Sequence, residues 1–323
     1  MPRNCHSQQK GEIALAIILA VIGLASIIFF AKPQNLFKAQ ATTAPTPIPT
    51  TEVSVTPSAT PSPSPSPSPS PTKSPSLIPS ATATPEVKSD NTPPGAGFKR
   101  QSVKTDVGTF SVSVVAANIG STRVIVDTAS ASDCSNECPA LPLGEYVSRN
   151  GAFAGLNGSF FCPLEYPSCA GKTNSFDTLL MNKDKYYFNS GNNVYSTIPA
   201  VIFGSGYVRF IKQSLEWGRD TNVDGVIANY PLYTFDNAIE FSGNSDGKLT
   251  NKSGRTFFGA TGDTIYLGIV HSATAAEAAQ VLQALGIHNS IGMDNGGSTA
   301  LWSGGYKAGP GRNIPTAILF LSR

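Results

Sequence analysis

The stretch of residues 274–302 decides the fold, and it reads T-A-A-E-A-A-Q-V-L-Q-A-L-G-I-H-N-S-I-G-M-D-N-G-G-S-T-A-L-W. Its first half predicts a helix, because T-A-A-E is a capping box and apolar residues then recur at i, i+3, i+4 and i+7 from Ala278 to Leu285. Gly286 is placed to end this helix in a left-handed conformation. The second half predicts a short buried strand, residues 287–293, that leads directly into an acid.

The residues that follow this strand are of the kinds that build a ligand site. Asp294 stands where a rigid strand leaves the core, which is where scaffolds present reactive groups. Gly296 and Gly297 permit backbone angles closed to other residues and let a ligand approach the main chain. Ser298 and Thr299 add hydroxyl groups beside the acid. The alternative is a tight turn between two strands, in which Asp294 only accepts turn hydrogen bonds.

The rest of the C-terminal region predicts an α+β fold, a mixed, mostly antiparallel β-rich domain with one well-indicated helix. From Phe98 onward, short β-rich runs are broken by glycine. Two alternating runs, residues 109–117 and 121–128, predict a hairpin that turns at residues 118–120. Gly262-Asp263 predicts a second hairpin turn. The other strand candidates are residues 151–156, 196–203, 207–211, 224–229, 256–260 and 264–271.

The charge distribution argues against one broad class of partner. The chain carries 23 Lys and Arg against 21 Asp and Glu, and residues 98–323 contain equal numbers of the two kinds. A neutral region of this sort has no basic face to neutralise a phosphate polymer. We therefore expect no nucleic-acid partner.

The N-terminal sequence predicts a membrane anchor. Residues 13–31 form an uncharged apolar run, long enough to span a bilayer as one helix. We predict a short cytoplasmic tail at residues 1–12 and a transmembrane signal-anchor at residues 13–31. Two alternatives remain open: a cleavable signal peptide cut near residues 39–41, and a pilin-like leader cut after Gly11.

The segment that follows, residues 32–97, predicts a disordered stalk. It is rich in Pro, Ser, Thr and Ala, with an unbroken Pro-Ser alternation from Pro61 to Pro71. Such a sequence cannot bury apolar surface and stays extended, largely as polyproline II. At roughly 3.1 Å per residue, its Thr/Ser/Pro/Ala-rich part, residues 41–97, reaches about 170 Å. It would hold residues 98–323 away from the membrane, so that we expect a single-pass protein of the cell membrane.

The cysteines indicate on which side of the membrane that domain lies. Cys134, Cys138, Cys162 and Cys169 are an even set in a region that the anchor would export, which favours two disulfides. The pairs Cys134–Cys138 and Cys162–Cys169 each close a short loop. A four-thiolate zinc site is the alternative, although the spacing lacks the usual C-x2-C knuckles. We therefore predict an extracytoplasmic domain.

Four further residues are candidates for the site. Asn157 ends a predicted strand and is followed by a glycine and a hydroxyl residue, as Asp294 is, so the two corners are expected to converge on one pocket. Arg255 and Arg312 lie at strand ends, where an arginine can bind phosphate or carboxylate; a rim salt bridge is the alternative for each. His271 also ends a strand and is a candidate acid or base, with a structural hydrogen bond as the alternative. Ser298 lacks the His and Asp partners of a serine hydrolase.

Four ordered motifs resemble those of the phosphodiester glycosidase domain. They are N-G-S-F-F, S-G-R-T-F-F-G-A-T-G-D-T-I-Y-L-G-I-V, M-D-N-G-G-S-T after the alanine-rich helix, and R-N-I-P-T-A-I. The resemblance covers about residues 100–323. The family typically shows N-G-G-F-F and L-D-G-G-G-S, so this chain departs from it at Ser159 and Asn295. Asn295 tolerates left-handed angles, which would preserve the turn, but its side chain would narrow the pocket.

The resemblance implies hydrolysis of the bond between a sugar's anomeric carbon and a phosphate. Asp294 would act as a carboxylate that stabilises an oxocarbenium-like centre or orients water, and Arg255 and Arg312 would hold the phosphate. The sugar hydroxyls would be bound by Asn157 and Ser298. The remaining motif positions carried over are Gly296 and Gly297.

Several assignments stay open at this point. A second carboxylate would come from Asp224, Asp236, Glu240 or Asp263. The sequence identifies no definite cofactor, and Ca²⁺ at Asp294 is a candidate without a supporting D-x-D-x-D-G loop. The expected partner is a sugar-phosphate or cell-surface glycan, and the sequence does not indicate an oligomeric state. A non-catalytic wall-glycan binding module on a stalk is the alternative function, and a pilus-like structural subunit is a third.

Overall fold

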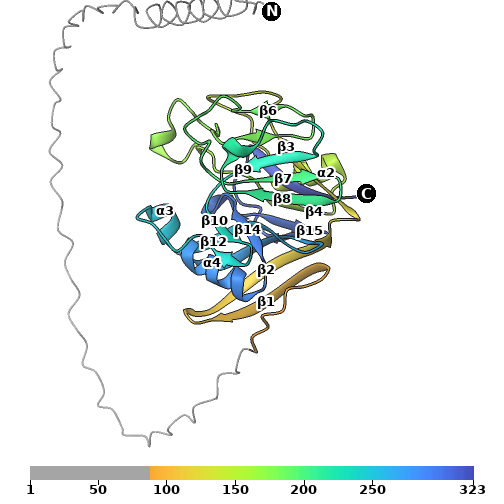
Figure 1. The fold of residues 1–323 in the computed structure, drawn as a ribbon. Helices are drawn as coiled ribbons and strands as arrows, with labels where there is room; N and C mark the ends of the chain where they lie inside the picture. The colour runs from red at the N-terminus through yellow and green to blue at the C-terminus, as the bar shows by residue number, and fades with distance from the viewer. Residues whose placement is uncertain (1–87) are drawn as a thin grey trace, which may run out of the picture. The chain divides into compact units, whose positions relative to one another are not determined.

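The computed structural model describes residues 88–323, which form three β-sheets (Figure 1). Every strand pairing in this part of the chain is antiparallel, so the predicted fold is right in being β-rich and mostly antiparallel, and no parallel pair is present in it. The predicted tail, the predicted span and most of the predicted stalk lie in residues 1–87, outside the described residues. Between residues 88 and 323, no helix combines the length and the apolar character needed to cross a membrane.

A seven-stranded sheet carries the predicted helix on its outer face. The T-A-A-E capping box is confirmed: the Thr274 amide donates to Glu277 Oε2 at 2.7 Å, and the Glu277 amide donates to Thr274 Oγ1 at 3.1 Å. Gly286 has a φ of 78°, as expected of a residue that ends a helix. The helix, α4 (Ala275–Ala284), buries Ala275, Ala278, Ala279, Val281 and Leu282 against the sheet. In spatial order the strands are β1 (Gly97–Thr105), β2 (Gly108–Asn118), β13 (Thr264–Ala273), β12 (Ser253–Thr261), β14 (Asn289–Gly292), β10 (Leu232–Phe235) and β11 (Ala238–Ile239).

Two five-stranded sheets complete the domain. The β17 sheet is ordered β16 (Tyr306–Ala308), β15 (Leu301–Ser303), β4 (Ala154–Asn157), β17 (Thr316–Ser322) and β3 (Thr122–Thr128). The β7 sheet is ordered β6 (Tyr187–Phe188), β5 (Leu180–Met181), β9 (Gly225–Ala228), β7 (Ala200–Gly204) and β8 (Tyr207–Ile211). Their inner faces and that of the seven-stranded sheet share one apolar core, which includes Phe258, Phe203 and Phe320. Burial of this shared core is the main force that holds the three sheets together.

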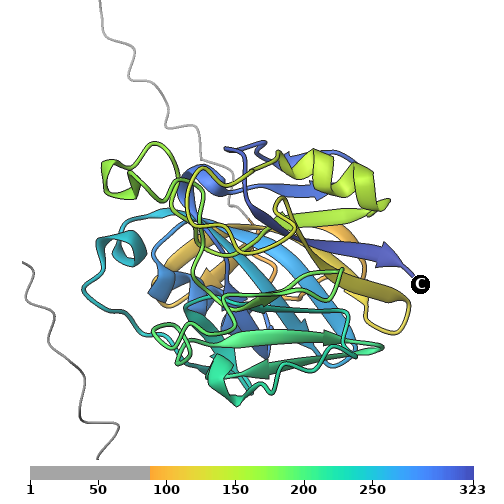
Figure 2. The same ribbon diagram turned by 90° about the horizontal axis from the view of Figure 1, so that it is seen from above.

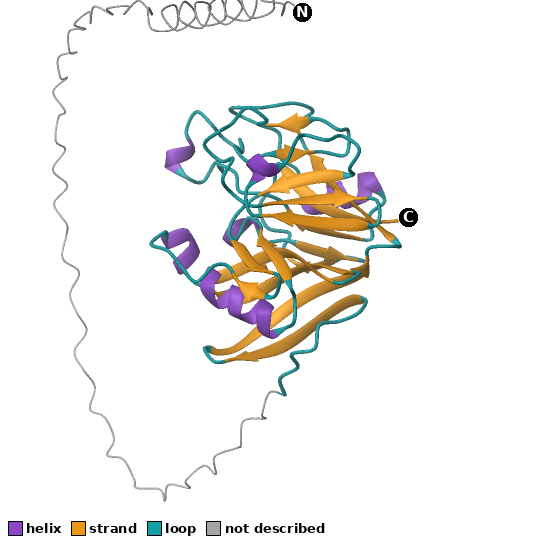
Figure 3. Ribbon diagram, viewed as in Figure 1, coloured by secondary structure: helices purple, strands orange, loops and turns teal. Residues whose placement is uncertain are grey.

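The helices lie outside the sheets (Figure 3). Helix α2 (Leu143–Asn150) packs on the β17 sheet through Tyr146 and Val147, beside β17 in Figure 2. Helix α3 (Gly247–Thr250) is a single turn capped by Asp246, whose side chain accepts from the Lys248 amide at 2.9 Å. This short turn forms one side of the candidate site.

The predicted hairpin of residues 109–128 is wrong. The turn at residues 118–121 exists, with the Gly120 amide bound to Asn118 Oδ1 at 2.9 Å. However, β2 already has β1 and β13 on its two sides, so that β3 pairs with β17 in a different sheet. The turn therefore carries the chain from one sheet to another. The second predicted hairpin is confirmed, since Thr261 and Thr264 close the β12–β13 pair around Gly262, whose φ is 54°.

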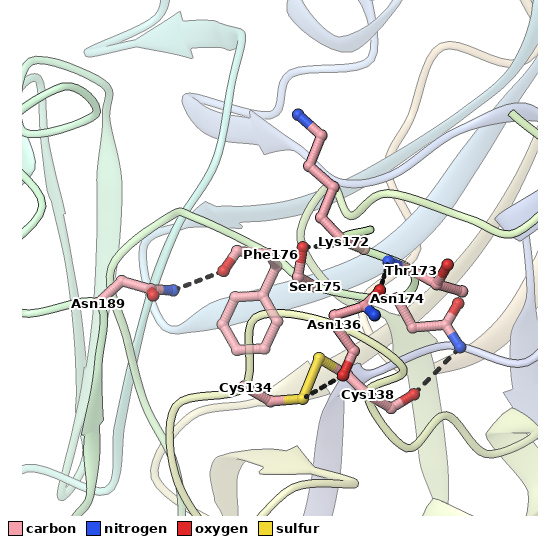
Figure 4. Close-up of a disulfide and its surroundings, with 9 residues drawn as sticks. All are labelled: Cys134, Asn136, Cys138, Lys172, Thr173, Asn174, Ser175, Phe176 and Asn189. Atoms are coloured by element: carbon pink, nitrogen blue, oxygen red, sulfur yellow. Dashed lines mark hydrogen bonds between the residues drawn. A yellow bond between two sulfur atoms is a disulfide. The ribbon is translucent and has the colours of Figure 1, made fainter. Parts of the chain in front are cut away.

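Both predicted disulfides, Cys134–Cys138 and Cys162–Cys169, are present in place of the alternative zinc site. Figure 4 shows how the first of them supports a neighbouring segment. Asn136 Oδ1 accepts from the Thr173 amide at 2.9 Å, and Asn174 Nδ2 donates to the Cys138 carbonyl at 3.1 Å. The small ring is thereby tied to residues 172–176.

Candidate active site

A cavity of about 690 Å³ opens where Asp294 leaves β14. One part of its lining is aromatic and another part is charged, which is the mixture expected of a site for a polar ligand with some apolar surface. Its cationic residues are Lys172, Lys248 and Arg312, and its acidic residues are Asp177, Asp246 and Asp294. Its aromatic residues are Phe160, Phe161, Tyr166, Phe176, Tyr195 and Tyr230.

The two polar corners predicted from the sequence do meet beneath this cavity. The Asp294 amide donates to the Gly158 carbonyl at 2.9 Å. The Asn157 side chain spans the turn, because its Nδ2 donates to the Asp294 carbonyl at 2.7 Å and its Oδ1 accepts from the Ala300 amide at 3.1 Å. Asn157 is fully buried and is not among the lining residues. The structure thus places Asn157 so that it fixes the Asp294 turn from below.

The Asp294 carboxylate is perturbed by its position. Burial raises the pKa of Asp294 to about 6 from an ordinary value of 3.8, while Ser298, the Asn295 amide, Arg312 and Lys248 act in the opposite direction. Asn295 N–H donates to Asp294 Oδ1 at 2.9 Å. A carboxyl group with a raised pKa in a cleft that also holds cations is typical of functional sites.

The two glycines after Asp294 are needed for different reasons. Gly296 has a φ of 63°, the left-handed conformation that was expected of this turn. Gly297 has no such conformation, so the backbone-angle explanation is wrong for it. Instead, the Arg312 guanidinium lies where a β-carbon at position 297 would be, and the Arg312 amide donates to the Gly297 carbonyl at 2.9 Å. Gly297 therefore makes room for the arginine that faces the cavity.

Asn295, the departure from the family pattern, lines the cavity as expected. Its φ is −124°, so it needs no left-handed conformation. Its Oδ1 accepts from the Thr256 amide at 3.2 Å, while its buried Nδ2 has no hydrogen-bond partner. Of the other buried side-chain atoms without a partner in the described part of the chain, Thr178 Oγ1 also belongs to a residue that lines the cavity. Buried polar atoms are normally paired, so Asn295 Nδ2 and Thr178 Oγ1 are available to a polar ligand.

Arg255 lies behind the cavity rather than in it. Its side chain is fully buried, and its guanidinium donates to the carbonyls of Ala273 at 2.9 Å and Lys248 at 2.9 Å, and also to those of Leu249 and Asn251. All these bonds go to the backbone, and most go to α3 and its flanks. Arg255 therefore holds the segment that carries Lys248. In this conformation its side chain does not reach the cavity, so it does not make the predicted phosphate contact.

His271 belongs to β13 and lies outside the cavity lining. Its Nε2 is 2.9 Å from Ser113 Oγ within the seven-stranded sheet. Burial lowers the pKa of His271, and Arg100 lowers it further. The structural hydrogen bond left open above is the arrangement observed.

None of the four candidates for a second carboxylate lines the cavity. Asp224 pairs with Arg123 at 2.8 Å and Glu240 pairs with Lys212 at 2.8 Å, while Asp236 and Asp263 lie in turns. The acids that do accompany Asp294 are Asp177 and Asp246. The sequence offered a signal for Asp246 only in retrospect, as the cap of a one-turn helix directly before the S-G-R-T motif.

The Cys162–Cys169 loop supplies contacts that the sequence did not reveal. Tyr166 lies near two cations of the cavity, with Arg312 Cζ 5.5 Å and Lys248 Nζ 5.8 Å from its ring centroid. Glu165 Oε2 is 3.6 Å from Arg312 Nη1. In residues 88–323, no group of three or more His, Cys, Asp or Glu side chains is placed to hold a metal ion, so Ca²⁺ at Asp294 stays a prediction.

Comparison with known proteins places this geometry in a family. The family model described as Phosphodiester glycosidase matches residues 150–321, more than half of the chain and the whole of the cavity. The chain belongs to the phosphodiester glycosidase family. The resemblance noted from the four motifs is thereby confirmed.

Solved structures similar to this phosphodiester glycosidase domain include two of low sequence identity. One is the catalytic domain of zebrafish N-acetylglucosamine-1-phosphodiester alpha-N-acetylglucosaminidase, auto-inhibited by its pro-peptide, with a TM-score of 0.54, 13% identity, and coverage of 75% of this chain and 85% of that one. Another is a hypothetical protein from Synechocystis, with a TM-score of 0.49, 14% identity, and coverage of 70% of this chain and 62% of that one. This chain therefore spans less than two thirds of the Synechocystis protein. A search of curated proteins gives no match.

Proposed function

We propose that this protein is a membrane-tethered, extracytoplasmic hydrolase that cleaves the bond between a sugar's anomeric carbon and a phosphodiester in a cell-surface glycan or glycoconjugate. The family supports a glycosidase acting on phosphodiester-linked sugars. The tether and the location rest on the apolar run of residues 13–31 and on the two disulfides.

The observation that carries the proposal is the grouping of Asp294, Arg312 and Lys248 around one cavity. Both cations attract the Asp294 carboxylate, and each therefore lowers the pKa of Asp294 against the larger effect of burial. In the proposed reaction the phosphate lies against Arg312 and Lys248, and the anomeric carbon lies beside Asp294. A cation on the phosphate and a carboxylate on the sugar stabilise opposite charges as they develop.

The proposed reaction is a hydrolysis in which water is the only second reactant. The bond between C1 and the bridging oxygen breaks, and its electron pair stays with the phosphate, which leaves as a phosphomonoester. Water adds to C1 and loses a proton, which the ionised Asp294 carboxylate or solvent takes up. Arg312 offsets the charge that grows on the leaving phosphate.

For Arg255 we propose a positioning role rather than the phosphate contact predicted from the sequence. Three of its four backbone hydrogen bonds hold residues 248–251, and Lys248, which lines the cavity, belongs to that segment. The aromatic residues Tyr166 and Tyr230 offer apolar faces on which a sugar ring can pack.

The test is incubation of the full-length protein, purified in mild detergent, with a panel of sugar-1-phosphodiesters, with and without a chelator. Release of free sugar by the wild type and its loss in Asp294→Asn are expected. Tight binding of wall polymer without release of sugar would contradict the proposed hydrolase activity and would support the alternative function, a glycan-binding module. Asn295 Nδ2, which has no hydrogen-bond partner, is also compatible with that alternative. Cell fractionation and N-terminal sequencing test the tether: a soluble, shortened product would show cleavage instead.

A further inference from the structure

The ion pair between Glu165 and Arg312 lies at the rim of the cavity. The two side chains approach to 3.6 Å, with 59% of the Glu165 side chain and 19% of the Arg312 side chain exposed. This distance is too long for a hydrogen bond, and an exposed pair of this kind contributes little stability. A phosphate group, which binds arginine through two parallel hydrogen bonds, therefore displaces the Glu165 carboxylate at small cost.

Glu165 stays near the phosphate after such a displacement. It belongs to the loop closed by Cys162–Cys169, and its neighbour Tyr166 lies over Arg312 and near Lys248. The disulfide joins the two ends of the loop, and the backbone groups of Cys162 and Cys169 are hydrogen-bonded to residues 172–175, so that the loop is held beside the cavity. A bound phosphate would therefore have a carboxylate beside it as well as the cations beneath it.

The charges around the cavity set the consequence of this arrangement. Three cations and three acids line it, and Glu165 adds one more negative charge at the rim. We propose that Glu165 discriminates between phosphate groups by charge, accepting a singly charged phosphodiester and disfavouring a doubly charged phosphomonoester. This proposal rests on the proposed function, in which the diester is the substrate and the monoester is the product.

The proposal gives Glu165 a part in turnover. Hydrolysis converts one negative charge on the phosphate into two at neutral pH, since the second pKa of a phosphomonoester is about 6. Repulsion by Glu165 then grows at the moment when the product must leave. Arg312 alone would hold the product more tightly than the substrate, because it attracts the greater charge more strongly.

The test compares two small ligands that differ in one methyl group and one charge, dimethyl phosphate and methyl phosphate. Their dissociation constants for the full-length protein are measured at pH 7.5 by ligand-detected NMR, which does not depend on turnover. In Glu165→Gln we expect methyl phosphate to bind roughly fivefold more tightly and dimethyl phosphate roughly twofold more tightly. Glu165→Asp, which keeps the charge, should behave like the wild type.

Glu216→Gln is the matched control, since Glu216 is an exposed acid outside the cavity lining, and it should change neither constant. Salt at 0.5 M should shrink the difference between the two ligands in the wild type. Equal gains for both ligands in Glu165→Gln, no gain, or no binding by any variant would overturn the proposal. Failure of the proposed function would look different, as charge discrimination with no release of sugar from any phosphodiester.

Discussion

The guanidinium group of Arg312 occupies the space that a side chain at position 297 would fill, and its backbone amide is bound to the Gly297 carbonyl at 2.9 Å. The arginine and the glycine turn are therefore one unit, although 15 positions separate them in the chain. A change in the glycine moves the cation.

Gly297→Ala should raise KM for a sugar phosphodiester by roughly tenfold, because the new methyl group displaces the Arg312 side chain and weakens a charge-assisted contact. Its melting temperature should stay close to that of the wild type, since Gly297 is exposed. Steady-state kinetics and a thermal melt provide both measurements.

Gly296→Ala is the matched control for this prediction. Gly296 has a φ of 63° and open space around its α-carbon, so alanine there is strained by about 1–2 kcal/mol without touching Arg312. It should lower the melting temperature more than Gly297→Ala does and raise KM less. The reverse order would disprove the packing role assigned to Gly297.

Asp294→Asn should stabilise the protein at pH 7.5 by about 1–2 kcal/mol, after allowance for solvent screening of a partly exposed group. The pKa of Asp294 is about 6 in the fold against an ordinary value of 3.8. Because the folded-state pKa is the higher one, the acid favours folding when protonated, below about pH 4. That contribution is lost as the pH rises through about 6. Urea melts at pH 4 and pH 7.5 should show the gap between variant and wild type only at the higher pH.

The activity of the wild type should rise with pH through about 6. The proposed mechanism needs Asp294 as a carboxylate, and its pKa is about 6, so kcat/KM follows the ionised fraction. A pH–rate profile on a sugar phosphodiester from pH 4.5 to 8 measures this. An activity that instead falls above pH 6 would assign Asp294 the role of a proton donor.

Arg255→Lys should destabilise the fold by about 2–4 kcal/mol, because an ammonium group cannot satisfy all four of the backbone carbonyls that the guanidinium now binds. KM should rise as well, since residues 248–251 lose their support. Arg312→Lys, at the cavity itself, should raise KM with a much smaller loss of melting temperature. If Arg255→Lys raised KM and left the melting temperature unchanged, the phosphate contact predicted from the sequence would be supported instead.

Loss of the first disulfide should be felt in the cavity. The double variant Cys134→Ser, Cys138→Ser should lose about 2 kcal/mol of unfolding free energy, because the unfolded chain gains entropy. Its KM should also rise, because the backbone of Cys138 is hydrogen-bonded to residues 173 and 174, next to the lining residues Lys172 and Ser175. Chemical denaturation and kinetics under non-reducing conditions test both effects. An unchanged KM in a folded variant would show that residues 172–176 hold their shape without it.

The sequence was informative where a local rule determines the local structure. The T-A-A-E box and Gly286 predicted both ends of α4, and Gly262-Asp263 predicted a hairpin, because each signal is satisfied by hydrogen bonds within a few residues. The convergence of Asn157 and Asp294 was also foreseen, since both end buried strands. The catalytic and binding roles assigned to the residues around these two corners stay predictions.

The sequence was uninformative where long-range contacts decide. Runs 109–117 and 121–128 have the pattern of a hairpin, yet the partners of β2 and β3 lie far away in the chain, at β13 and β17. Arg255 was predicted to bind phosphate because it lies at a strand end within a family motif, whereas its guanidinium is taken up by the backbone carbonyls of residues 248–251 and of Ala273, 18 positions away. Glu165 and Lys248 carry no motif at all, since their meaning comes from the position of Arg312.

The two cysteines of the Cys162–Cys169 loop have α-carbons only 5.3 Å apart. A segment whose ends are so close can be exchanged for another of different length or composition without moving the chain on either side. Asp294 lies just after β14, outside such an exchange, whereas Glu165 and Tyr166 lie within it. Grafted loops between these two cysteines would therefore replace the groups that contact Arg312 and leave Asp294 in place, which is a practical way to alter the preference for the group on the far side of the phosphate.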